Sequence, residues 1–138
     1  MNREEFCKIL RECRQQSEKT MKEIGFELNM LPGDIYRLEK GGNNFAFDKA
    51  IDFLKTVECV IKLQNGKSLF IVSDYELLIK WIVAVRAKKY SQRSLAEAAT
   101  CSYVAIANIE RRKNIMRIDI FLKIVDALGY TVTIEKKQ

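Results

Sequence analysis

The side chains of this 138-residue chain that are best suited to bind a ligand are its lysines and arginines. The sequence holds 24 of them against 18 Asp and Glu, which gives a formal net charge of +6 at pH 7. Residues 1–70 carry 12 basic and 11 acidic side chains, whereas residues 71–138 carry 12 and 7. A basic excess of this kind favours an anionic partner such as nucleic acid. The second half is therefore the better candidate for such binding.

Chemistry that needs other residue types has little support in the sequence. Histidine, the commonest general base and nitrogen ligand of metals, is absent. Four cysteines occur without a Cys-x-x-Cys spacing, and we interpret them as small apolar residues in a reducing compartment: Cys7, Cys13, Cys59 and Cys101. No glycine-rich phosphate loop and no nucleophile–base pair is evident. We predict neither an enzyme nor a metal or cofactor site.

The apolar pattern also bears on the compartment. No apolar run follows the first residues, so we expect no signal peptide. No uncharged stretch reaches 18 residues, so we expect no membrane span and a cytoplasmic protein.

The elements that position the basic residues follow from an internal repeat. A shift of 71 residues places apolar positions on apolar positions without a gap. It matches Phe6, Cys7, Leu10 and Cys13 with Leu77, Leu78, Trp81 and Ala84. Each copy is predicted to contain four helices and a strand. The expected fold is mainly α with a small antiparallel sheet, with units over 1–64 and 74–138 joined by a hairpin strand or linker over 65–73.

Capping signals set the expected helix boundaries. In the first copy we expect helices near 3–16, from the Thr20 capping box, from Pro32 to about residue 40, and over 47–57. In the second copy, Ser73-Asp74-Tyr75-Glu76 reads as a capping box that opens a helix through about residue 88. Ser91 and Ser102 are expected to cap the next two helices, and a last helix covers about 118–128.

Three short segments are predicted to be strands. Residues 59–64 alternate, residues 68–73 are rich in β-formers, and Asn65-Gly66 between them predicts a hairpin with both residues at positive φ. The alternating tail over 130–135 is expected to join this hairpin, because a lone two-stranded ribbon is marginal. One edge of the sheet would remain open for a homodimer or another partner.

The clearest motif runs from Tyr90 to Glu110, Tyr-Ser-Gln-Arg-Ser-Leu-Ala-Glu-Ala-Ala-Thr-Cys-Ser-Tyr-Val-Ala-Ile-Ala-Asn-Ile-Glu. It resembles the helix-turn-helix of the phage-repressor family, of the Cro/C1 or XRE type. With the matching first copy, the resemblance covers about 2–64 and 74–136. It implies two lambda-repressor-like units and a sequence-specific DNA-binding regulator of repressor type, which reads the major groove with the helix at about 102–111.

The resemblance also implies roles for individual residues. Base contacts are expected from Ser102, Tyr103, Val104 and Asn108, with Asn108 suited to adenine. Phosphate contacts are expected from Lys88, Lys89, Gln92, Arg93, Arg111, Arg112 and Lys113. Helical spacing predicts that residues 103, 104, 107, 108 and 111 point outward. The alternative for Asn108 and the basic run is an ordinary solvated helix face.

Three positions depart from the family pattern. Thr100 stands where a turn glycine is usual, Arg112 where a second glycine is usual, and Met116 where a proline is usual. In the first copy, Leu31, Pro32, Gly33 and Arg37 occupy the reading positions, so that only Arg37 offers a base contact. We expect the first copy to recognise DNA sequence less well than the second copy.

Two other functions remain open. The terminal strand resembles that of HipB-type antitoxins, which bind their operator and a kinase-like toxin protein. Alternatively, the chain is a protein-assembly module that does not read DNA. The expected partner is double-stranded DNA, and the expected setting is the nucleoid of a bacterium or a phage-infected cell.

Overall fold

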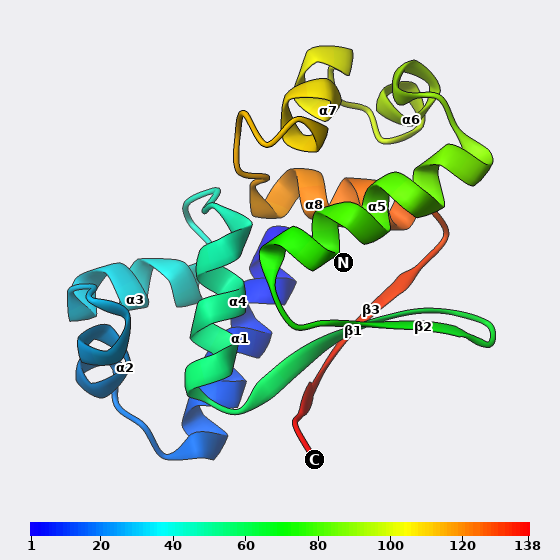
Figure 1. Cartoon of the computed structure of the whole chain (residues 1–138). Coiled ribbons are helices and arrows are strands. Elements are labelled where there is room, and N and C mark those ends of the chain that lie inside the picture. The colour runs from blue at the N-terminus through cyan, green and yellow to red at the C-terminus, as the bar shows by residue number, and fades with distance from the viewer.

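The computed structural model describes all 138 residues as eight helices and a three-stranded antiparallel sheet (Figure 1). The first half contains α1 (Arg3–Ser17), α2 (Met21–Leu28), α3 (Pro32–Lys40), α4 (Phe47–Thr56) and β1 (Cys59–Asn65). After β2 (Ser68–Val72) follow α5 (Tyr75–Lys89), α6 (Gln92–Ala98), α7 (Tyr103–Glu110), α8 (Ile118–Ala127) and β3 (Thr131–Lys136). The predicted fold class is confirmed. None of these helices is long and apolar enough to cross a membrane.

Three helices, α2, α6 and α7, begin at the predicted capping residues. The Thr20 hydroxyl accepts from the Glu23 N–H and the Glu23 carboxylate accepts from the Thr20 N–H, both at 3.1 Å. Ser91 and Ser102 cap α6 and α7. The predicted box at Ser73 is wrong, because Asp74 is the N-cap and its carboxylate accepts from the Leu77 N–H at 2.8 Å. Aspartate caps at least as well as serine, and its position one residue later fixes the start of α5.

The sheet has the order β2-β1-β3, so the tail strand joins the hairpin as predicted. Ile61 lies opposite Val72 on one side and opposite Ile134 on the other. The predicted turn is wrong by one residue, because Asn65 pairs with Ser68 and the loop is Gly66-Lys67. Gly66 alone has a positive φ there, of 59°. A single positive φ at the first loop residue suffices for a two-residue hairpin when glycine occupies that place.

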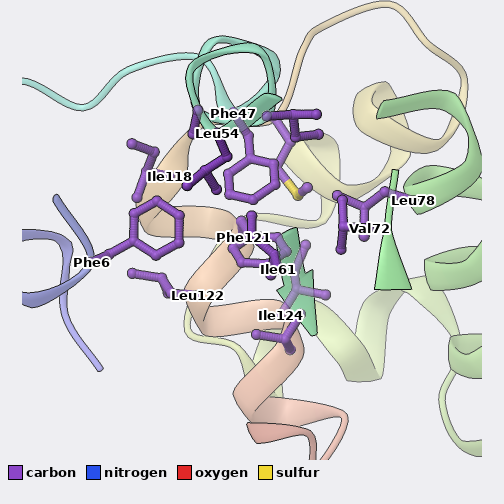
Figure 2. Packing of buried hydrophobic residues seen from close by; sticks show 14 of the residues in the cluster. Phe6, Phe47, Leu54, Ile61, Val72, Leu78, Ile118, Phe121, Leu122 and Ile124 are labelled. Carbon is purple, nitrogen blue, oxygen red and sulfur yellow. The ribbon is translucent and has the colours of Figure 1, made fainter. Parts of the chain in front are cut away.

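One continuous apolar core joins both halves of the chain (Figure 2). At its centre the rings of Phe47 in α4 and Phe121 in α8 stack with centroids 3.9 Å apart, and Phe6 of α1 packs against both. Two backbone bonds link the halves beside these rings. The Phe47 N–H donates to the Met116 carbonyl at 2.7 Å, and the Ile118 N–H donates to the Phe45 carbonyl at 2.9 Å.

The buried face of α5 differs from the predicted alignment. Its buried residues are Leu78, Ile79 and Ile82, whereas Leu77 is 47% exposed and Ala84 is exposed. A shift of 72 residues, not 71, brings the buried residues of α1 onto those of α5. The cause is loop length, since three residues separate α1 from α2 and only two separate α5 from α6. An ungapped alignment therefore misplaces this helix by one residue.

Candidate nucleic-acid interface

Helices α6 and α7 form a compact pair joined by a tight turn over 99–102. Thr100 adopts φ 54° in this turn, in the left-handed region that a β-branched residue rarely occupies. The Ser102 hydroxyl then accepts from the Ala105 N–H at 3.0 Å and starts α7. Leu95 and Ile106 are buried and anchor the pair on the core. The pair lies on the far side of α5 and α8 from the sheet (Figure 1).

Small residues allow the close crossing of the two helices. Ala96 in α6 is only 3% exposed, and its N-terminal counterpart in α2 is Gly25. A Cβ added at Gly25 would lie 2.5 Å from the Met30 carbonyl oxygen, so this first-half position requires glycine.

The outward face of α7 carries most of the predicted base-contacting residues. Val104 is 61% exposed and Tyr103 is 38% exposed, Ser102 is exposed and Asn108 is half-buried. The expectation that residue 107 points outward is wrong, because Ala107 is 7% exposed. Helix α7 packs against both α6 and α5, which widens its buried face beyond Ile106 and Ile109. The open face is therefore narrower and centred on residues 103, 104 and 108.

Two arginines lie over this face in defined positions. The Arg93 guanidinium stands 4.3 Å from the centroid of the Tyr103 ring, a cation–π arrangement that leaves its N–H groups available to an anion. The Arg111 guanidinium donates to the Asn108 side-chain oxygen at 3.1 Å. The Asn108 amide N–H groups remain available as donors. Both arginines thus border the exposed residues of α7.

A buried ion pair fixes α7 to the rest of the second half. The Arg86 guanidinium in α5 donates two hydrogen bonds to the Glu110 carboxylate, at 2.5 and 3.0 Å. The Gln92 amide in α6 donates a third at 2.9 Å. The Gln92 side chain is therefore bound to Glu110. The group of Gln92 that can bind a phosphate is its backbone N–H, at the start of α6.

The same pair exists in the first half. The Arg14 guanidinium donates to the Glu39 carboxylate at 2.5 and 3.0 Å, which raises the pKa of Arg14. The sequence alone does not identify Arg86 and Arg14 as the partners of Glu110 and Glu39. The only trace of the pairs in the sequence is two glutamates 71 residues apart and two arginines 72 residues apart.

Exposed cations surround the α6–α7 pair. Five of them form no ion pair with a carboxylate: Lys88, Lys89, Arg93, Arg111 and Lys113. Arg112 takes φ 62° at the position of the missing glycine and binds Glu76 at 2.7 Å, and this hydrogen bond lowers the pKa of Glu76. Residues 88–113 carry six Lys or Arg and two Glu. The surface is strongly positive where α7 is open.

The corresponding α2–α3 surface has different chemistry. Residues 17–42 carry four Lys or Arg and five Asp or Glu. Arg37 pairs with Asp34 at 2.7 Å, so the one predicted base-contacting side chain of this half is held by a neighbouring carboxylate. Phe26 is 89% exposed and Leu31 is 71% exposed, which sequence reasoning missed. This surface is close to neutral and partly apolar.

Comparison with known proteins bears on the second half alone. Residues 82–134, from within α5 to within β3, match the family model described as Helix-turn-helix. No curated protein and no solved structure is significantly similar to the chain. The matched segment includes α6, α7 and every predicted base contact except Arg37. It supports DNA binding through a helix-turn-helix in this half of the chain.

Proposed function

We propose that this protein is a sequence-specific DNA-binding regulator that places α7 in the major groove. The observation that carries the proposal is the open face of α7 within the matched segment. Arg93 and Arg111 contact this face, and they belong to a set of five cations in residues 88–113 that no carboxylate neutralises. In helix-turn-helix docking the second helix contacts base edges with its N-terminal residues. The N-terminal residues Ser102, Tyr103 and Val104 are the exposed ones here.

The proposed contacts divide into two kinds. At the bases, Asn108 binds adenine and Val104 contacts a thymine methyl group, while Ser102 and Tyr103 bind a base or a phosphate. At the phosphates, the contacts come from the unpaired cations Lys88, Lys89, Arg93, Arg111 and Lys113 and from the backbone N–H of Gln92. Arg112 joins them by exchanging its ion pair with Glu76 for a phosphate. The first kind gives sequence preference, and the second gives affinity that falls with salt.

We further propose that the chain is a tandem of two units over 1–64 and 74–138, linked by 65–73. Residues 47 and 118 are equivalent under the shift of 71, and so are residues 45 and 116. The hydrogen bond from the Phe47 N–H to the Met116 carbonyl is therefore equivalent to the one from the Ile118 N–H to the Phe45 carbonyl. In the same way, the pairing of Ile61 with Ile134 is equivalent to the pairing of Leu63 with Val132. This reciprocity supports a pseudo-twofold relation, as in a repressor dimer fused into one chain. With Arg37 paired to Asp34, the first unit is a scaffold, and a palindromic operator then requires two copies of the chain.

A protein-binding role is a second candidate function, either as an antitoxin or as an assembly module. The observation that favours it is the exposed apolar surface of the first half, where Phe26 and Leu31 line one hollow beside α2 and α3. Exposed apolar groups gathered on one surface mark contact sites for proteins. The two roles are compatible, since they use different halves of the chain.

The decisive experiment is selection of bound duplexes from a random DNA pool, followed by sequencing. Enrichment of a motif is the expected result, and its symmetry tells whether one or both units read. Only salt-sensitive binding without enrichment would contradict sequence reading and leave the protein-binding role.

Matched variants in the two units assign the contacts. Arg93→Ala should weaken binding to all duplexes and flatten the dependence of log K on log salt by about one unit. Lys22→Ala, at the corresponding position of α2, should leave both unchanged. Asn108→Ala should relax the preference at one base pair by about 1–3 kcal/mol, whereas Arg37→Ala should not. Equal effects in both units would refute the assignment of reading to α7.

A further inference from the structure

Strand β2 is an edge of the sheet that has none of the usual protection against pairing. Ser68-Leu-Phe-Ile-Val72 contains no charged residue and no proline, and its neighbour β1 lies on one side only. Leu69 is 51% exposed and Ile71 is 47% exposed. Natural edge strands are normally blunted by charge, proline or a covering element. The other edge strand, β3, does carry charges at Glu135 and Lys136.

The hydrogen-bonding pattern tells which backbone groups of β2 are free. The Lys137 N–H donates to the Glu58 carbonyl at 2.7 Å, just beyond the paired ends of β3 and β1. Because antiparallel pairs alternate, even-numbered residues of β1 face β3 and odd-numbered ones face β2. Residues 68, 70 and 72, which lie opposite odd-numbered residues, face β1. The N–H and C=O groups of Leu69 and Ile71 therefore point to the open edge.

We propose that a second copy of the chain pairs antiparallel with β2 about a twofold axis at Phe70. In this register Leu69 lies opposite Ile71 of the other copy, and the two residues exchange both backbone hydrogen bonds. The axis generates the same exchange a second time, which makes four bonds. A twofold interface must be complementary to itself, and β2 meets this condition in both hydrogen bonds and side chains.

Alternation of the side chains selects this register over its neighbours. A slip by one residue would place the outward Leu69 against the inward Val72, which the pleat forbids. A slip by two toward Lys67 would place Ile71 opposite that lysine, and a slip by two in the other direction would place Leu69 opposite Ser73. Only the axis at Phe70 places both Leu69 and Ile71 opposite an apolar side chain of the other copy. The assembly is a six-stranded sheet with β3 strands at both ends.

The inner face of the pair contributes an aromatic contact. The Phe70 ring stacks on the single tryptophan, Trp81 of α5, with centroids 5.0 Å apart. At the twofold axis the two Phe70 side chains are direct neighbours in a non-hydrogen-bonded pair, where the chains approach to about 4.5 Å between Cα atoms. Pairing of β2 therefore changes the surroundings of Trp81.

The first test is the mass of the full chain in solution by light scattering. The unmodified protein is expected to be a dimer. Ile71→Lys is expected to be a folded monomer, because the lysine would lie on the outward face and would place a charge opposite the apolar Leu69 of the other copy. Ile115→Lys is the matched control, since Ile115 is 50% exposed in the loop before α8 and lies outside the sheet. Leu69→Lys provides a second edge variant, and circular dichroism verifies the fold of each. A monomeric parent, or a dimer that survives both edge variants, would overturn the proposal.

Disulfide cross-linking tests the register. The experiment uses a Cys101→Ala background, in which the remaining native cysteines are buried. The Leu69→Cys chain, the Ile71→Cys chain and an equal mixture of the two are each oxidised. Opposed residues of a hydrogen-bonded pair lie about 5.5 Å apart at Cα, within disulfide range. The mixture should form a covalent heterodimer several times faster than either variant forms a homodimer. Faster formation of either homodimer would place the axis at another residue and refute the register. Both measurements need no DNA, so they succeed or fail independently of the DNA-binding role.

Discussion

The Arg86–Glu110 pair allows one prediction to be worked from structure to measurement. Glu110→Ala removes a carboxylate that accepts three hydrogen bonds and joins α5, α6 and α7. The side chains of Arg86 and Glu110 are 13% and 8% exposed. The variant leaves a guanidinium that is nearly buried and has no anionic partner.

The expected loss is about 3 kcal/mol of unfolding free energy. Removing one member of a buried ion pair costs about 3–5 kcal/mol. The lower end applies, because Arg86 keeps a hydrogen bond to the Tyr90 carbonyl at 3.1 Å. A domain of this size has about 5–15 kcal/mol in total, so the variant should remain folded at 25 °C and melt roughly 10 °C lower.

Urea unfolding followed by circular dichroism measures the loss. Glu97→Ala is the control, since Glu97 is exposed on α6 and forms no ion pair. The double variant Arg86→Met with Glu110→Leu should regain most of the stability, because apolar replacement of a buried pair is close to neutral. Glu39→Ala should behave like Glu110→Ala, since Glu39 holds Arg14 with the same geometry.

A loss below about 1 kcal/mol would refute this reasoning, since it is the size expected for an exposed pair. A double variant no more stable than Glu110→Ala would also contradict it, because the lost stability would then come from packing and not from an isolated charge. Duplex binding gives a second readout: Glu110→Ala should weaken DNA binding, while Glu39→Ala should weaken it less at a temperature where both are folded.

Three further predictions concern the stability of the fold. Thr100→Asn should raise the unfolding free energy by about 0.5–1 kcal/mol in urea titrations, because asparagine tolerates the left-handed conformation at φ 54°; a destabilised variant would contradict the strain. Burial raises the pKa of Cys7 to about 11 and that of Cys13 to about 12. The contribution of these thiols to the unfolding free energy should therefore be complete below the ordinary thiol pKa near 9 and should fall by about 1–3 kcal/mol as the pH rises toward 11. Cys7→Ala should flatten that fall, and an identical pH profile would refute the assignment. Truncation after Gly129 removes β3 with its half-buried Val132 and Ile134, and should lower stability by about 3 kcal/mol; an unchanged melting curve would show that the β1–β3 pairing contributes nothing.

Local features of the chain were predictable from sequence. Thr20, Ser91 and Ser102 start helices because a side-chain oxygen caps amides two or three residues away, and this interaction needs no distant partner. The match of apolar spacing between the halves likewise indicated four helices and a strand in each. The mixed outcome at Ser73 and Asp74 has the same origin, since two adjacent residues can both cap and local chemistry does not choose between them.

The candidate site was predictable in part. The spacing of Tyr103, Val104 and Asn108 placed them on one face of a helix, and the structure leaves that face open. The same periodicity wrongly predicted that Ala107 is exposed, because α7 packs against α5 as well as α6, and α5 lies outside the helix-turn-helix pair. Periodicity tells which residues share a face, but the width of the buried face depends on how many helices pack against it.

The sequence by itself determined the element types, the starts of α2, α6 and α7, the partner strand of the tail and the uneven charge. Tertiary structure alone decided the one-residue offset of α5, the partners of Glu39 and Glu110, and the exposure of Phe26. The division has a physical reason. Capping, turn chemistry and periodicity act over a few residues along the chain, whereas burial and ion pairing depend on which distant segments meet in space.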